Sequence, residues 1–162
     1  MNKVVALLFA ILACAWVPAW AEDDGVPPVS DLQKDGAAAR AINGVVLLAL
    51  VAENCVYCEH VLKDFLEPMS HNTSYQERVV MRRVLVTGLD DVRGFDGKST
   101  TPAELAEQYG TNFTPTVVLL DSAGHRLVKA LIGFSGADYY GMYLDEAIDA
   151  AVAKVRGQAP KQ

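Results

Sequence analysis

Residues 53–60 read Glu-Asn-Cys-Val-Tyr-Cys-Glu-His and place two cysteines, separated by two residues, between an apolar run and a helical pattern. Residues 45–51 (Val-Val-Leu-Leu-Ala-Leu-Val) carry no charge, are too few to span a membrane, and are typical of a strand buried on both faces. Residues 56–67 repeat apolar side chains at three- and four-residue spacing, which predicts an amphipathic helix that Pro68 ends or kinks. The cysteines should therefore lie at a strand-to-helix turn.

This turn suits thiol chemistry. Cys55 falls near the predicted N-cap, and Cys58 follows one turn later on the same face. Unpaired N–H groups and the helix dipole stabilise a thiolate, so we expect a lowered pKa for Cys55, although Glu53 and Glu59 oppose that effect. Cys58 can resolve a mixed disulfide on Cys55 and close an internal disulfide. The pair predicts thiol–disulfide exchange through a redox-active Cys55–Cys58 disulfide, with no other cofactor.

Two other uses of the cysteines are half of a metal site and a purely structural disulfide. Zinc needs about four ligands, and with no second Cys-x-x-C pair the remaining ligands would have to come from His60, His71 or His125. We expect all three histidines at the surface and no bound metal. A copper or zinc carrier using the cysteines and a nearby histidine is the alternative from a different functional class.

The start of the chain has the pattern of a secretory signal peptide over residues 1–21. Lys3 provides the positive region, residues 4–13 the apolar region, and residues 19–21 (Ala-Trp-Ala) the cleavage site. A membrane anchor would need a longer apolar stretch. Lipid attachment at Cys14 is the other alternative, but Leu12 is unusual for that motif. We therefore expect a periplasmic protein released from a cleaved signal peptide.

Composition limits the function further. Removing residues 1–21 from the 162-residue chain leaves the length of one domain, and the motif then holds all the remaining cysteines. Because 14 basic residues face 20 acidic ones, nucleic acid is not an expected partner. We expect a monomer with a flexible leader over 22–29, one domain over 30–156 and a flexible tail over 157–162.

The remaining pattern alternates helices and strands. Ser30 and Asp31 can cap a helix that runs to about Ile42, with Gly44 marking its end. Residues 79–86 form a second predicted strand, and the long loop over 88–100 is either functional or a surface insertion.

A further helix should begin at Thr101 with a capping box and end near Gly110. Pro115 should open a strand, because proline is disfavoured inside a central one. Residues 125–131 should return as the second arm of a hairpin, and residues 136–156 form the closing helix.

This order of parts resembles the thioredoxin fold over about residues 30–156, an α/β fold with a central mixed sheet flanked by helices. By that resemblance, Thr114-Pro115 is a cis-proline element beside the cysteines. Catalysis would fall to Cys55 and Cys58. Residues implied in substrate binding are Val56, Tyr57, Thr114 and Pro115, with Phe113 and Phe134 as further contributors to the apolar rim.

A narrower resemblance is to exported thioredoxin-like proteins of the SoxW type, which are associated with bacterial sulfur oxidation. The short matching motifs are Phe95-Asp96-Gly97, Glu104-Leu105-Ala106, Tyr109-Gly110, Thr114-Pro115-Thr116, Asp121, Gly124 and Gly133-Phe134. The resemblance implies a periplasmic thiol–disulfide oxidoreductase that reduces disulfides or oxidised cysteines of exported proteins. A membrane thiol electron donor would regenerate it.

Two positions depart from the thioredoxin pattern. Ala49 stands six residues before the first cysteine, where the family keeps an acidic residue, so another base or water must accept a proton from Cys58. Val56-Tyr57 replaces the usual Gly-Pro between the cysteines, which leaves the direction of electron flow open. A disulfide oxidant or isomerase is therefore the alternative within the same class.

Overall fold

The computed structural model describes residues 25–110 and 113–157. The predicted signal peptide with its Cys14, the first part of the predicted leader and residues 158–162 of the predicted tail lie outside the described residues. Within the described ranges, no helix has both the length and the apolar character needed to cross a membrane.

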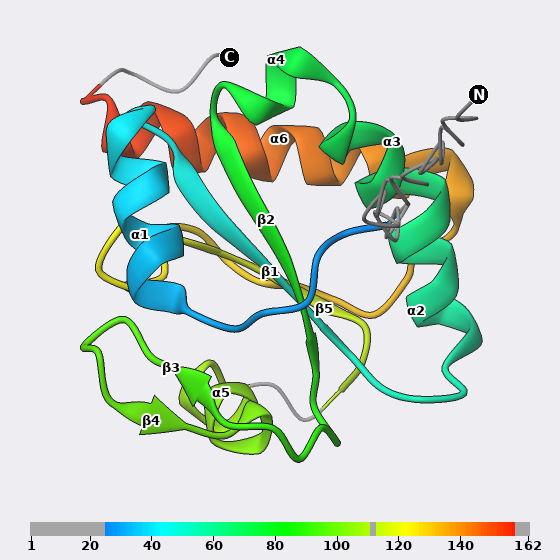
Figure 1. Cartoon of the computed structure of the whole chain (residues 1–162). Coiled ribbons are helices and arrows are strands. Elements are labelled where there is room, and N and C mark those ends of the chain that lie inside the picture. Colours follow the sequence, from blue (N-terminus) through cyan, green and yellow to red (C-terminus); the bar gives the residue numbers. More distant parts are fainter. Residues whose placement is uncertain (1–24, 111–112, 158–162) are drawn as a thin grey trace, which may run out of the picture.

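A mixed β-sheet forms the centre of the molecule (Figure 1). The strands of the described residues are β1 (Val45–Val51), β2 (Val79–Leu85), β3 (Val92–Arg93), β4 (Ser99–Thr100), β5 (Thr116–Leu120) and β6 (Leu131–Ile132). In this part of the chain the central sheet has the order β2-β1-β5-β6, in which β1 is parallel to β2 and antiparallel to β5. The predicted α/β fold with a mixed central sheet is confirmed.

Helices cover both faces of this sheet. They are α1 (Leu32–Ala41), α2 (Val56–His60), the π-helical η1 (Val61–Leu66), α3 (Glu67–Ser70), α4 (Thr73–Gln76), α5 (Pro102–Gln108) and α6 (Ala137–Val155). Alternate residues of β1 enter two cores: Leu47 packs in a cluster with residues of η1 and α6, whereas Leu48 packs in a cluster with residues of α1 and α5. Burial on both faces explains the uninterrupted apolar sequence of β1.

The helix that carries the cysteines is longer than the sequence predicted. The chain stays helical from Val56 to Ser70 and passes through Pro68. In an α-helix the proline ring would clash with the carbonyl four residues earlier, at Asp64. Over η1 the turns are wider, and the N–H of Glu67 bonds to the carbonyl of Leu62. We attribute the tolerance of Pro68 to this wider turn.

Residues 25–29, the end of the predicted leader, run along the outer side of β2. Pro28 pairs with Arg83 of β2 in a parallel bridge, flanked by hydrogen bonds from Val29 N to Arg83 O and from Arg83 N to Pro27 O, both 2.9 Å. Val26 is buried in the core. Burial of this side chain and the two hydrogen bonds hold the segment along the outer side of β2.

The predicted hairpin arm over 125–131 is mostly not a strand. Arg126 pairs with Leu120 and Leu131 pairs with Val117, so the returning arm is two residues longer than β5 between these pairs. The extra residues interrupt the ladder in the manner of a β-bulge. Regular pairing resumes only at β6, whose Ile132 lies opposite Thr116.

The start of α1 and the turn after its end can each be traced to particular residues. Asp31 caps α1 by accepting from Lys34 N, and Asn43, rather than Gly44, adopts the positive φ after the helix. Gly44 is required for a different reason, since a Cβ there would lie 2.3 Å from the carbonyl oxygen of Arg78. The loop over 88–100 contains the small hairpin β3–β4.

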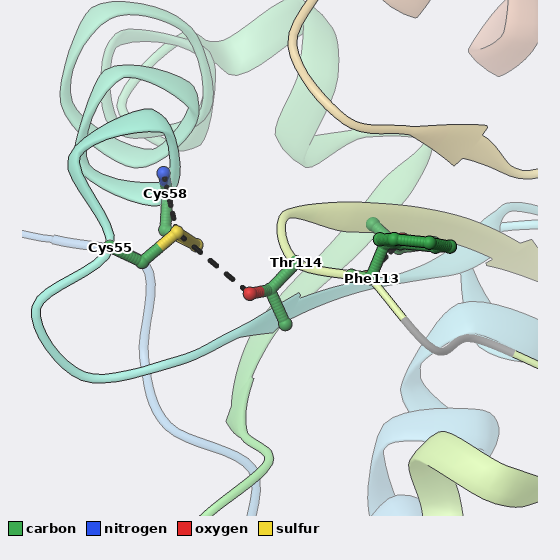
Figure 2. Close-up of a disulfide and its surroundings, with 5 residues drawn as sticks. Cys55, Cys58, Phe113 and Thr114 are labelled. Carbon is green, nitrogen blue, oxygen red and sulfur yellow. Dashed lines mark hydrogen bonds between the residues drawn. A yellow bond between two sulfur atoms is a disulfide. The ribbon is translucent and has the colours of Figure 1, made fainter.

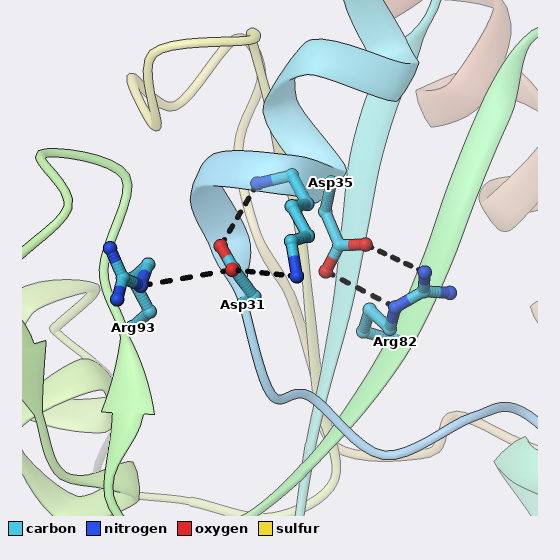
Figure 3. Close-up of polar contacts among 5 residues, drawn as sticks. Asp31, Asp35, Arg82 and Arg93 are labelled. Atoms are coloured by element: carbon cyan, nitrogen blue, oxygen red, sulfur yellow. Dashed lines mark hydrogen bonds and ion pairs between the residues drawn. The ribbon is translucent and has the colours of Figure 1, made fainter.

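An ion pair joins α1 to β2 at the edge of the second core (Figure 3). The guanidinium of Arg82 donates to both carboxylate oxygens of Asp35, at 3.1 and 2.6 Å. Asp35 is almost fully buried, and burial raises its pKa while Arg82 opposes the rise. Nearby, Asp31 also faces Arg93 of β3 at 3.7 Å, which ties the β3–β4 hairpin to the start of α1.

Candidate active site at the Cys55–Cys58 turn

Cys55 and Cys58 form a disulfide where β1 passes into α2. Asn54 takes a positive φ of 54°, which turns the chain so that Cys55 becomes the N-cap residue. The N–H of Cys58 donates to the sulfur of Cys55 over 3.2 Å. Cys58 is 2% exposed, whereas Cys55 is partly exposed. Their unequal exposure leaves Cys55 as the sulfur that a partner can reach.

The loop before β5 lies directly beside this disulfide (Figure 2). Thr114 Oγ1 donates to the sulfur of Cys55 over 3.8 Å, and the Thr114–Pro115 peptide bond is cis. Thr116 is fully buried, and its hydroxyl donates to the carbonyl of Phe113 over 2.7 Å. The structure therefore brings the cysteines and Thr114-Pro115 together, although Cys55 and Thr114 are 59 residues apart in the sequence.

Apolar side chains border Cys55 on the helix side. The apolar side chain of Val56 is 66% exposed, and the aromatic side chain of Tyr57 is 61% exposed. Phe113 is also exposed, but its ring points away from the two cysteines in Figure 2. Of the rim residues suggested by the sequence, Val56 and Tyr57 are therefore placed at the disulfide, while Phe113 faces elsewhere.

His60 and Phe134 form a stacked pair that the sequence did not predict. The imidazole of His60 stacks on the ring of Phe134, with centroids 5.5 Å apart and planes 8° apart. His60 Nδ1 lies 2.8 Å from Asp64 Oδ2.

Charges near the cysteines are partly compensated. Glu59, which we expected to oppose a thiolate, lies 3.6 Å from Lys63 one turn along the helix. Both side chains are well exposed, so solvent screens them. Ala49 is fully buried in the same core cluster as Cys58, so the position of the missing acid is apolar.

The histidines do not converge on the cysteines. His125 Nδ1 lies 3.0 Å from Asp121 in its own turn, and His71 follows α3. Among residues 25–110 and 113–157, no group of three or more His, Cys, Asp and Glu side chains is arranged to hold a metal ion.

Comparison with known proteins agrees with the fold and the site. The family model of the thioredoxin-like domain matches residues 32–148, and the chain belongs to this family. The matched residues contain the whole Cys-x-x-C turn and the Thr114-Pro115 loop.

Solved structures of low identity share the fold. A thioredoxin-fold protein from Helicobacter pylori is 20% identical, with a TM-score of 0.54 over 71% of this chain and 81% of that one. Thioredoxin f2, in a complex with ferredoxin:thioredoxin reductase, is 20% identical, with a TM-score of 0.50 over 79% of this chain and 96% of that one. A search among curated proteins found no match.

Proposed function

We propose that this protein is a periplasmic thiol–disulfide oxidoreductase that reduces disulfides of exported partner proteins. One observation carries the proposal: a partly exposed Cys55 sulfur lies between the N–H of Cys58 and the hydroxyl of Thr114, beside a cis-proline loop. Both donors can stabilise a thiolate on Cys55 after reduction. Membership of the thioredoxin-like family and the Cys-x-x-C disulfide support the same chemistry.

The reaction has two exchanges. The Cys55 thiolate attacks one sulfur of a partner disulfide, forming a mixed disulfide and releasing the other partner sulfur as a thiolate. Cys58 loses its proton to water or to that thiolate, since Ala49 offers no base, and then attacks the sulfur of Cys55. The Cys55–Cys58 disulfide forms and the partner leaves as a dithiol with two electrons. A membrane thiol donor returns two electrons to the pair.

Partner binding fits the same arrangement. An extended segment around the partner cysteine can pair with the backbone at Thr114, beside the Cys55 sulfur, while Val56 and Tyr57 contact its apolar side chains. Main-chain pairing selects shape more than sequence, so the protein should accept several partners. A SoxW-type role in sulfur oxidation is the narrower form of this proposal.

Cysteine variants test the chemistry. With a disulfide-bonded test protein as substrate, Cys55→Ser should abolish reduction, whereas Cys58→Ser should accumulate a mixed disulfide because attack survives and resolution does not. Equal thermal unfolding of both variants would exclude misfolding as the cause. A wild-type protein that reduces no disulfide and binds copper or zinc stoichiometrically would instead establish the carrier.

Equilibration with glutathione buffers separates a reductase from an oxidant. A reduction potential of about −270 mV is expected for a reductase, and one of about −120 mV would establish an oxidant. Export is tested separately, by mass spectrometry of the chain produced in a bacterial host. A mature N-terminus at Glu22 is expected, and a lipid-modified Cys14 would contradict the proposed cleavage.

A further inference from the structure

Phe134 lies where three parts of the molecule meet. Its ring contacts those of Tyr57 at 6.1 Å, His60 at 5.5 Å and Phe65 at 6.1 Å, all from the helix that carries the cysteines. It also contacts Tyr140 of α6 at 5.4 Å. Centroid distances in this range are typical of favourable aromatic pairs. Phe134 therefore connects the exposed Tyr57 to the buried Tyr140.

The backbone next to Phe134 is attached to the other wall of the site. Gly133 N donates to the carbonyl of Pro115 over 2.8 Å, and the preceding residue, Ile132, pairs with Thr116. Gly133 has a φ of 77°, a conformation that glycine adopts without strain. The segment over residues 132–134 is thus bonded to the cis-proline loop on one side and stacked on the cysteine helix on the other.

The link formed by residues 132–134 matters because the cysteine helix and the cis-proline loop are far apart in the sequence. Cys55 belongs to the turn before α2, and Thr114 to the loop before β5. Thr114 Oγ1 meets the Cys55 sulfur over 3.8 Å, a long contact that a small rotation of the helix would break. Attack on a disulfide also requires the nucleophile to be aligned with a segment held at the loop.

We propose that Phe134 is a positioning residue that holds the Cys55–Cys58 helix against the Thr114-Pro115 loop and so sets the contact between Cys55 and Thr114. Its effect on partner reduction rests on the proposed function, whereas its effect on the contact does not. Phe134 acts through its ring on the helix and through the backbone bond of Gly133 on the loop. It takes no part in bond making or breaking.

A double-mutant cycle measures the positioning without any partner. The pKa of Cys55 is obtained for the reduced protein from the ultraviolet absorbance of the thiolate, in wild type, Phe134→Leu, Thr114→Val and the double variant. Thr114→Val alone should raise this pKa by about one unit, because a donor to the thiolate is lost. In the Phe134→Leu background, Thr114→Val should raise the Cys55 pKa by less than half as much, since Thr114 no longer meets Cys55.

Ring-retaining and distant variants are the controls. Phe134→Tyr keeps the stack and should behave as wild type, and Tyr139→Leu removes an exposed ring from α6 and should leave the cycle unchanged. The NMR signals of the His60 ring should lose their ring-current shift in Phe134→Leu but not in Phe134→Tyr. Additive effects of Phe134→Leu and Thr114→Val in a folded protein would overturn the proposal.

Exchange rates then link the positioning to activity. At a pH well above the Cys55 pKa of both proteins, where the thiolate fraction does not limit the rate, Phe134→Leu should slow reduction of a peptide disulfide by about tenfold, since misalignment is costly for a segment held at the loop. Reduction of a small aromatic disulfide, which needs only Cys55, should change by less than about twofold. Equal slowing of both substrates would contradict the positioning role. A wild-type protein that reduces neither substrate would contradict the proposed function, while the double-mutant cycle on the Cys55 pKa would still test the positioning.

Discussion

Thr114 Oγ1 donates to the sulfur of Cys55, so a side chain of the cis-proline loop touches the proposed nucleophile directly. Thr114→Val keeps the shape and removes the donor. We expect the rise of the exchange rate with pH to move to higher pH than in wild type, because the Cys55 thiolate forms less readily. Rates measured across pH check this, and Thr114→Ser, which keeps a hydroxyl, is the matched control. Identical pH profiles for the valine and serine variants would show that the hydroxyl is unimportant.

Tyr57 lies between the two cysteines, largely exposed, with its ring 6.1 Å from that of Phe134. Tyr57→Ala should weaken partner binding and lower the exchange rate by about fivefold to tenfold, because an exposed aromatic contact near the reacting sulfur is lost. Thermal unfolding should change little, since the side chain is not central to a core. Exchange rates with several partner proteins test this, and a rate equal to wild type for every partner would place the binding surface elsewhere.

Asp35 and Arg82 should show strong energetic coupling. Arg82→Met leaves a buried carboxylate without its partner and should lower the free energy of unfolding by about 3 kcal/mol. Adding Asp35→Asn should recover much of that loss. Urea unfolding of the single and double variants gives the coupling. Lys98→Met, which breaks the exposed pair with Asp96, is the control and should barely change stability. Independent, additive losses at Asp35 and Arg82 would argue against the pairing.

Tyr140 has a buried hydroxyl with no hydrogen-bond partner among the described residues. Tyr140→Phe should therefore raise the free energy of unfolding by about 1 kcal/mol at neutral pH. Urea unfolding at neutral pH measures this, with Tyr139→Phe, an exposed neighbour, as the control. A clear loss of stability in Tyr140→Phe would mean that the hydroxyl makes a stabilising contact.

Alkaline pH should destabilise the fold through Tyr109 and Tyr140. Burial raises the pKa of each tyrosine from 10.0 to about 12, with Asp121 adding to the rise at Tyr109. A folded-state pKa above the unfolded one gives stability that is complete below about pH 10 and is lost as pH rises through about 12. Unfolding measured from pH 9 to about pH 12 should show this loss, and it should be smaller in Tyr140→Phe. Equal losses in wild type and variant would contradict the assigned cause.

Local patterns were enough to predict the cysteine turn, the longer helices and the strands β1, β2 and β5. Cys55 as a cap, the buried strand β1 and the Thr101 capping box all depend on residues within a few positions of one another. The differences have two sources, an unusual turn within one helix and pairing between distant segments. Pro68 stays in a helix because of the wide turn over the neighbouring η1, and residues 25–29 follow β2 because they pair with it.

The site shows the same division. Thr114 was placed beside Cys55 only through family resemblance, because no local pattern brings together residues 59 positions apart. Phe134 was named only as a contributor to the rim, and its ring contacts could not be predicted for the same reason. Its four ring contacts come from the helix over residues 56–70 and from α6, and no periodicity within residues 131–136 indicates them.

The pairing of Pro28 with Arg83 also affects how the molecule meets other chains. An open edge strand offers unpaired donors and acceptors to any extended segment and is a common route to aggregation. Here the outermost segment beside β2 contains Pro27 and Pro28, which have no N–H to donate. Strand addition along β2 is therefore disfavoured, whereas the loop at Pro115, beside the Cys55 sulfur, is the place proposed for pairing with an extended partner.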